Sequence, residues 1–203
     1  MKRELVLTTT GADDTRSLAA TVAGALRLGD IVSLTGELGA GKTCFVQGAA
    51  AALGVTERVT SPTFLLRRDY EGRVPLVHLD VYRLDILQEA AELGLDDVER
   101  CVTFIEWGDA MQPLLPADHL EIEFHAVLDD GDAAPTNTSG SASDAVSAGG
   151  GAADPAAIGT DELRRIVVRP RGADWRRRIV SLAVDCGPWR RDGGPSHLDA
   201  LEL

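Results

Sequence analysis

The sequence contains few aromatic residues, few cysteines and few basic residues, and each shortage excludes a class of protein. Only 4% of its 203 residues are aromatic while 44% are hydrophobic, so aliphatic side chains must form most of the core. Three widely separated cysteines, Cys44, Cys101 and Cys186, exclude a disulfide framework and match no metal-binding spacing. Lys and Arg number 20 against 32 Asp and Glu, which argues against a protein whose main task is to grip nucleic acid.

Long hydrophobic runs are also missing. The N-terminal run 5–7 is too short for a signal peptide, and no later stretch reaches the roughly 20 apolar residues of a membrane helix. We therefore expect a reduced, cytoplasmic protein that has no membrane partner.

Short apolar runs alternate with helical patterns, which predicts an α/β fold with a mostly parallel central sheet and one antiparallel hairpin. The expected strands are 5–8, 31–34, 64–70, 74–80, 101–106, 120–124 and 165–168. The expected helices are one that carries Leu18, Val22 and Leu26 and ends at Gly29, one that carries Phe45, Ala49 and Leu53, and two over 86–93 and 174–184.

A change in composition predicts a flexible insert within a single domain. Residues 129–160 are mostly Ala, Gly, Ser, Asp, Thr and Pro, with five aspartates and no basic residue. Such a segment buries too little apolar area to offset the entropy lost on ordering it. We expect a folded core over 1–128, a last strand and helix of the same domain over 161–187, and a loose tail over 188–203.

The strongest motif is a glycine-rich loop between an expected strand and an expected helix. It reads Gly36, Glu37, Leu38, Gly39, Ala40, Gly41, Lys42, Thr43 and matches G-x-x-x-x-G-K-T in full. Glycines let backbone N–H groups surround phosphate oxygens, and the N-terminus of the next helix favours negative charge. Lys42 would reach the β- and γ-phosphates, and Thr43 would ligate magnesium, which predicts ATP and Mg²⁺ as ligands.

A phosphate-binding loop of this kind needs an acidic partner for its magnesium, usually at the end of a neighbouring strand. Asp80 follows Val77-His78-Leu79, and Glu106 follows the apolar run 102–105. Strand ends gather at the ligand edge of an open α/β sheet, so both carboxylates are candidates. His78 is either a catalytic group or a residue that makes a structural hydrogen bond.

A third feature is the hydroxyl-rich segment Thr60, Ser61, Pro62, Thr63, Phe64. Pro62 fixes its own φ and biases the preceding residue toward an extended conformation. The hydroxyls could sense a γ-phosphate or position the attacking water. The same pattern is typical of a capped loop before a strand, and the residues alone favour that structural interpretation.

Four motifs occur in a fixed order: 36–43, then Ser61-Pro62-Thr63-Phe64, then 78–83 (His-Leu-Asp-Val-Tyr-Arg), then Glu106-Trp107. In this respect residues 5–124, with 165–184, resemble the TsaE (YjeE) family. The resemblance implies a small three-layer P-loop ATPase that takes part in tRNA threonylcarbamoyladenosine biosynthesis. It also implies TsaB and TsaD as partners, which transfer the threonylcarbamoyl group, and contact with tRNA only through their complex. ATP hydrolysis would reset that complex between rounds.

The resemblance also assigns roles to residues. It implies that Thr43 and Glu106 hold magnesium, that Asp80 lies beside them, that 61–64 form a nucleotide-sensitive switch, and that Trp107 lies near the nucleotide. We also expect Cys44, directly after the loop, to be among the nucleotide-binding residues, although the family usually has a second Thr or Ser there. The long insert is the other departure from the family pattern.

Other functions remain open at this point. A GTPase is disfavoured, because the only asparagine, Asn137, lies inside the insert and cannot form an Asn-Lys-x-Asp motif. A small-molecule phosphotransferase would need a lid arginine, for which 67–68 and 176–178 are weak candidates. A nucleotide-sensing interaction module would bind ATP without turning it over. We expect part of the adenine site within 8–15.

Overall fold

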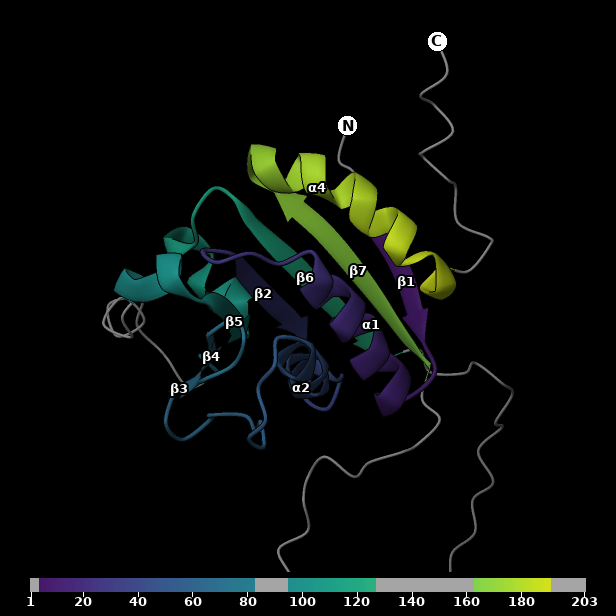
Figure 1. Cartoon of the computed structure of the whole chain (residues 1–203). Helices are drawn as coiled ribbons and strands as arrows, with labels where there is room; N and C mark the ends of the chain where they lie inside the picture. The colour runs from purple at the N-terminus through teal and green to yellow at the C-terminus, as the bar shows by residue number, and fades with distance from the viewer. Residues whose placement is uncertain (1–3, 83–94, 127–162, 191–203) are drawn as a thin grey trace, which may run out of the picture.

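The computed structural model describes residues 4–82, 95–126 and 163–190, which form a mixed α/β structure around one sheet (Figure 1). The expected helix over 86–93, the insert over 129–160 and most of the expected tail lie outside the described residues. In the three described ranges, no helix combines the length and the apolar character that crossing a membrane requires.

The sheet has seven strands in the order β1-β7-β6-β2-β5-β4-β3. Their bounds are β1 Leu5–Thr9, β2 Ile31–Gly36, β3 Arg67–Tyr70, β4 Leu76–Asp80, β5 Val102–Glu106, β6 His119–Ala126 and β7 Arg164–Arg171. The central pairs β6/β2, β2/β5 and β5/β4 are parallel, while β1/β7, β7/β6 and β4/β3 are antiparallel. The predicted parallel centre and the predicted hairpin are both confirmed.

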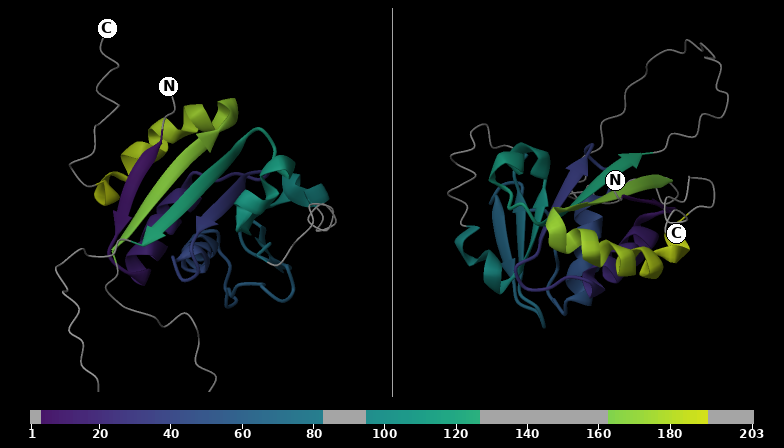
Figure 2. Two further views of the ribbon diagram at one scale, coloured as in Figure 1. Left: turned by 180° about the vertical axis from the view of Figure 1, so that it is seen from behind. Right: turned by 90° about the horizontal axis from the view of Figure 1, so that it is seen from above.

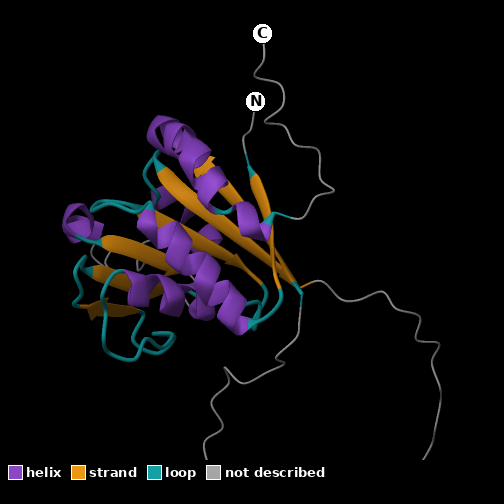
Figure 3. Cartoon of the chain, turned by 45° about the vertical axis from the view of Figure 1, so that its right-hand side comes forward, coloured by secondary structure: helices purple, strands orange, loops and turns teal. Residues whose placement is uncertain are grey.

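Three α-helices cover one face of the sheet, as the helix and strand colours of Figure 3 show. They are α1 Ala12–Gly24, α2 Lys42–Ala52 and α4 Gly172–Asp185. Short 3₁₀ helices are η1 Leu95–Arg100, η2 Gly108–Leu114 and η3 Gly187–Trp189. Met111 of η2 packs on the opposite face, with Ile31, Val77 and Ile105. The parallel part of the sheet is therefore covered on both faces.

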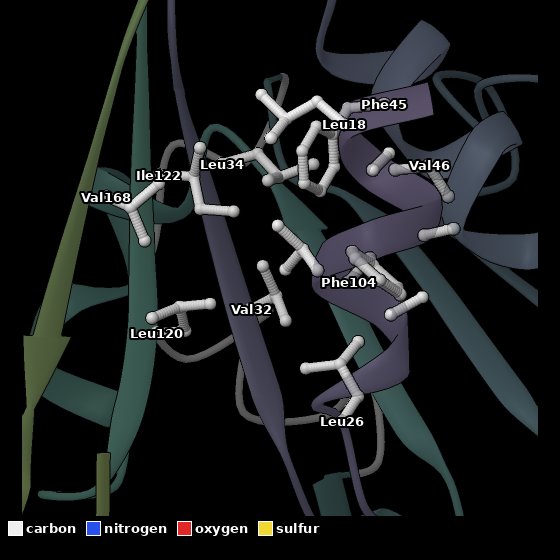
Figure 4. Close-up of a cluster of buried hydrophobic side chains, with 14 of the residues drawn as sticks. Leu18, Leu26, Val32, Leu34, Phe45, Val46, Phe104, Leu120, Ile122 and Val168 are labelled. Atoms are coloured by element: carbon white, nitrogen blue, oxygen red, sulfur yellow. The ribbon is translucent and has the colours of Figure 1, made fainter. Parts of the chain in front are cut away.

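The larger hydrophobic core lies between the sheet and the three α-helices (Figure 4). Leu34, Phe104 and Phe45 are fully buried there, and Phe45 meets Phe124 edge to face with ring centroids 5.7 Å apart. Helices α1 and α2 approach closely at Gly48, where a Cβ would lie 2.3 Å from the carbonyl oxygen of Arg16. This close packing fixes the helix that carries the glycine-rich loop.

The antiparallel part of the sheet is formed by β1, β7 and β6, which the left view of Figure 2 shows from behind, and its back face carries charged side chains. Arg169 pairs with Glu123 and with Glu4, and Arg171 pairs with Glu121 at 2.5 Å. The hydrogen bond from Arg169 lowers the pKa of Glu123. Cross-strand ion pairs of this kind suit a solvent-facing sheet surface, where each contributes less than about 1 kcal/mol.

Several expected boundaries are wrong: β4 begins at 76 and not 74, β7 ends at 171 and not 168, and two further differences arise from hydrogen bonds in turns. Helix α1 ends at Gly24, before Gly29, because the next amides donate to carbonyls three residues back and tighten the last turn. Strand β3 begins at 67, not 64, because the amides of Leu65 and Leu66 both donate to the Pro62 carbonyl and close a turn, with φ 63° at Leu66.

Candidate functional site

The predicted motifs meet at one edge of the sheet, where the parallel strands β2, β5 and β4 end. The glycine-rich loop runs from the end of β2 into α2, and Asp80 and Glu106 are the last residues of β4 and β5. These two carboxylate residues are register partners on adjacent strands. The parallel register therefore places both acids beside the loop, as expected for the ligand edge of such a sheet.

Two glycines of the loop are required by its geometry. Gly41 caps α2 in the left-handed region with φ 107°, which side chains rarely adopt. Gly36 has φ 132°, and a Cβ there would lie 2.5 Å from the carbonyl oxygen of Phe124. The loop thus presents the unpaired N–H groups of a helix N-terminus at the sheet edge, an arrangement suited to an anion.

Lys42 lies inside the loop with its ammonium group held by three neighbours. Its Nζ donates to the carbonyls of Gly36 at 2.7 Å and Glu37 at 2.8 Å, and it lies 3.7 Å from the ring centroid of Trp107. Burial lowers the pKa of Lys42, against the opposing attraction of nearby carboxylates, Glu106 first. A positive charge that is partly desolvated in this way interacts strongly with any anion that reaches it.

Thr43 and Glu106 come together although they are far apart in the sequence. The Thr43 hydroxyl donates to Glu106 Oε1 at 2.7 Å, and Nε2 of His78 lies 2.9 Å from the same oxygen. Both Glu106 and His78 are buried. One hydroxyl and one carboxylate therefore converge beside Lys42, and both offer the oxygen atoms that magnesium prefers.

Asp80 is occupied by the hydroxyl-rich segment. Its Oδ2 accepts hydrogen bonds from Ser61 Oγ and Thr63 Oγ1, both at 2.6 Å, and the two hydroxyls lie 2.7 Å from each other. Its Oδ1 accepts from the amide of Tyr82 at 3.1 Å. Asp80 thus fixes the segment to the end of β4, while Glu106 faces Thr43.

Three predicted residues point elsewhere. The Thr60 hydroxyl accepts a hydrogen bond from Arg68 at 2.8 Å and does not join the Ser61 cluster. Phe64 is 84% exposed at the tip of the turn. Cys44 donates its thiol to the carbonyl of Ala12 in α1, so its side chain contacts that helix.

Sequence reasoning did not single out two residues that lie at the site. Tyr82 packs against Trp107 at a tilt, with ring centroids 4.8 Å apart. It lies within the third motif, 78–83, but the motif gave it no role of its own. Arg164 begins β7, and its Nε would lie 3.5 Å from a Cβ placed on Gly41. No local sequence pattern predicts that Arg164 lies at the site, because only the pairing of β7 with β1 and β6 brings this residue to the loop.

The oxygen atoms of Thr43 and Glu106 suit magnesium better than a metal ion whose ligands all come from protein side chains. In the described part of the chain, no three His, Cys, Asp or Glu side chains cluster in a way that could hold a metal ion. Magnesium usually binds one or two carboxylates, keeps several waters and takes its other ligands from substrate phosphates. Thr43 and Glu106 are sufficient for such a site.

Comparison with known proteins agrees with this geometry. The family model described as "Threonylcarbamoyl adenosine biosynthesis protein TsaE" matches residues 9–132, which include all four motifs. The tRNA threonylcarbamoyladenosine biosynthesis protein TsaE of Bacillus subtilis is 37% identical over 131 residues, which cover 63% of this chain and 82% of the relative. The protein of the same name from Treponema pallidum is 42% identical over 123 residues, 58% of this chain and 89% of the relative.

A solved structure has a similar fold. The crystal structure of Bacillus subtilis YdiB superposes with a TM-score of 0.65 at 27% identity and covers 91% of this chain and 97% of its own. The family match spans more than half of the sequence and includes the site residues at the sheet edge. The chain therefore belongs to the TsaE family of threonylcarbamoyl adenosine biosynthesis proteins.

Proposed function

We propose that this protein is the magnesium-dependent ATPase component of a tRNA threonylcarbamoyladenosine modification system. Its ATP turnover would reset a transferase formed by TsaB and TsaD homologues. The protein would contact tRNA only through that complex. The observation that carries the proposal is the convergence of Lys42, Thr43 and Glu106 at the end of the parallel strands. Membership of the TsaE family supports the pathway.

ATP binding would use groups that the loop already presents. The N-terminal amides of α2 would donate to phosphate oxygens, with the helix dipole adding a favourable field. Lys42 would exchange its two carbonyl partners, Gly36 and Glu37, for phosphate oxygens. The phosphate oxygens carry a negative charge that the carbonyls lack, so this exchange adds a direct attraction between opposite charges at a partly desolvated site and favours the bound state.

Magnesium would be held by Thr43 and Glu106 and would neutralise charge that develops between the β- and γ-phosphates. Glu106 is the better direct ligand because Asp80 already accepts three hydrogen bonds from its own neighbourhood. Asp80 would act one step further out, by holding Ser61 and Thr63. Because a γ-phosphate competes for these same hydroxyls, the segment 61–64 would respond to the nucleotide state.

The Trp107 side chain provides a direct test of nucleotide binding. If ATP draws Lys42 away from the indole, Trp107 fluorescence should change as ATP and magnesium saturate the site. Trp107→Phe should abolish this change while calorimetry still detects binding. Trp189→Phe is the matched control and should retain the change, since Trp189 bonds to Asp14 on α1. An unchanged signal in a protein that binds ATP would contradict this account of Lys42.

Partner proteins should set the rate of hydrolysis. Fast hydrolysis in P-loop enzymes commonly uses an arginine finger, worth about 10³–10⁵ in rate. Arg164 lies beside Gly41, but in the described residues the contacts of Lys42, Thr43 and Glu106 outside this group of three are with backbone carbonyls, an indole and an imidazole, and none of them is with an arginine. We therefore expect slow hydrolysis by the protein alone and faster hydrolysis with TsaB and TsaD.

The measurement is single-turnover hydrolysis of bound ATP with increasing TsaB–TsaD. As a control, the Glu106→Gln variant is mixed with the same partners, and this mixture measures any ATP hydrolysis by the partners themselves. Hydrolysis at tens per second by the lone protein, unaffected by partners, would contradict the proposal and favour a self-sufficient phosphotransferase. Stable ATP binding without turnover in any mixture would instead favour a sensing module.

A further inference from the structure

A buried histidine lies directly behind the carboxylate of Glu106. His78 is in the middle of β4 and its side chain is 0% exposed, and the Glu106 side chain is 5% exposed. Its Nε2 lies 2.9 Å from Glu106 Oε1, the oxygen that also accepts from Thr43. Two donors from two different elements thus fix one oxygen of this carboxylate, and neither of these two hydrogen bonds uses Oε2.

The contact also determines which ring nitrogen carries the proton. A carboxylate only accepts hydrogen bonds, so Nε2 of His78 must be the donor toward Glu106. Nδ1 is buried and has no hydrogen-bond partner among the described residues. The opposite tautomer would place two acceptors face to face and leave a buried N–H unsatisfied, which is costly. The imidazole therefore serves one polar contact, the one with Glu106.

We propose that His78 is the positioning residue of the magnesium site, which holds the Glu106 carboxylate in its ligating orientation. The inference rests on the proposed function, because it assumes that Glu106 is a magnesium ligand. Glu106 is a flexible side chain, and the Thr43 hydroxyl that now holds it is itself needed by the metal. His78 is then the donor that remains on the protein side and keeps the carboxylate from rotating away.

A purely structural role would make a different prediction. A histidine that only fills the core can be replaced by an apolar residue of similar size at a cost in stability alone. A positioning histidine also alters metal affinity, and groups that orient metal ligands typically change it by about 10- to 100-fold. His119 offers a matched control. It too is buried, with 9% of its surface exposed, and its Nδ1 lies within hydrogen-bond distance of the Pro116 carbonyl. It begins β6, a strand that carries none of the proposed site residues.

The test is the magnesium concentration required for ATP binding by the full-length chain, measured by calorimetry. We expect His78→Leu to raise this concentration at least about tenfold. His78→Gln places an amide N–H near the position of Nε2 and should recover most of the loss, while His119→Leu should match wild type. In a Glu106→Gln background His78→Leu should add little, since coupled residues are not additive.

Two results would overturn the proposal while leaving the proposed function intact: wild-type magnesium dependence in folded His78→Leu, or equal losses in the Leu and Gln variants. Magnesium-independent ATP binding by the wild type would instead defeat the proposed function itself. If His78→Leu does not fold, nitrogen NMR of the wild-type imidazoles decides the matter. The Nε2–H tautomer, with a resonance that shifts when Mg²⁺ and ATP are added, supports the proposal, and the Nδ1–H tautomer overturns it.

Discussion

Replacing Lys42 by alanine is expected to remove ATP turnover and to weaken ATP binding at least about tenfold, while the domain remains folded. Hydrogen bonds that involve a charged group contribute about 1.5–3 kcal/mol each, and a loss of 1.4 kcal/mol is a tenfold loss of affinity. In the structure the Lys42 ammonium interacts with two carbonyls and with Trp107. When the ammonium is removed, water at the edge of the sheet can take its place and donate to the two carbonyls. The fold therefore depends on Lys42 much less than phosphate binding does.

Calorimetry with ATP and magnesium, together with a thermal melt, measures both effects. Arg73→Ala is a matched control, because Arg73 is also basic and contacts α2 but donates to Ala52 at the opposite end of the helix from Lys42. It should leave ATP affinity unchanged. Wild-type turnover in folded Lys42→Ala protein would show that the loop does not bind phosphate as proposed.

Substitutions of the two carboxylates, Glu106→Gln and Asp80→Asn, are expected to have different effects on magnesium dependence. Glu106→Gln removes the negative charge of the proposed magnesium ligand, and it leaves Thr43 and His78 only a neutral amide oxygen to donate to, which makes weaker hydrogen bonds than a carboxylate. We expect ATP turnover to fall at least about a hundredfold and the magnesium requirement for ATP binding to rise. Asp80→Asn should also abolish turnover, but with a smaller change in magnesium requirement, because Asp80 holds Ser61 and Thr63.

Turnover and ATP binding measured across a magnesium titration separate these outcomes. Glu123→Gln, on the charged back face of the sheet, is the control and should affect neither, since its partner is Arg169. Equal magnesium dependence in Glu106→Gln and wild type would rule out Glu106 as a ligand. Normal turnover by Asp80→Asn would rule out a required role for the tether at Ser61 and Thr63.

Sequence patterns predicted the elements of the site because each depends on local conformation. A loop with left-handed φ at Gly36, Gly39 and Gly41 requires glycine, and the motif shows it directly. The apolar run before the loop gave a buried strand, and Asp80 and Glu106 end strands as their flanking residues indicated. The expected boundaries at Gly29 and Phe64 were wrong because each depended on a pair of hydrogen bonds in a turn, which composition does not encode.

The sequence by itself determined the loop, the order of the strands along the chain and the identity of the two acids. The tertiary structure decided which side chains meet. The register of β4 against β5 places Asp80 beside Glu106 and brings His78 to the same carboxylate, while the Thr60 hydroxyl accepts a hydrogen bond from Arg68 of β3. Arg164 reaches Gly41 only because β7 pairs between β1 and β6. Short-range sterics fix local conformation, whereas strand register is set by the packing of the whole sheet, so these contacts cannot be inferred from neighbouring residues.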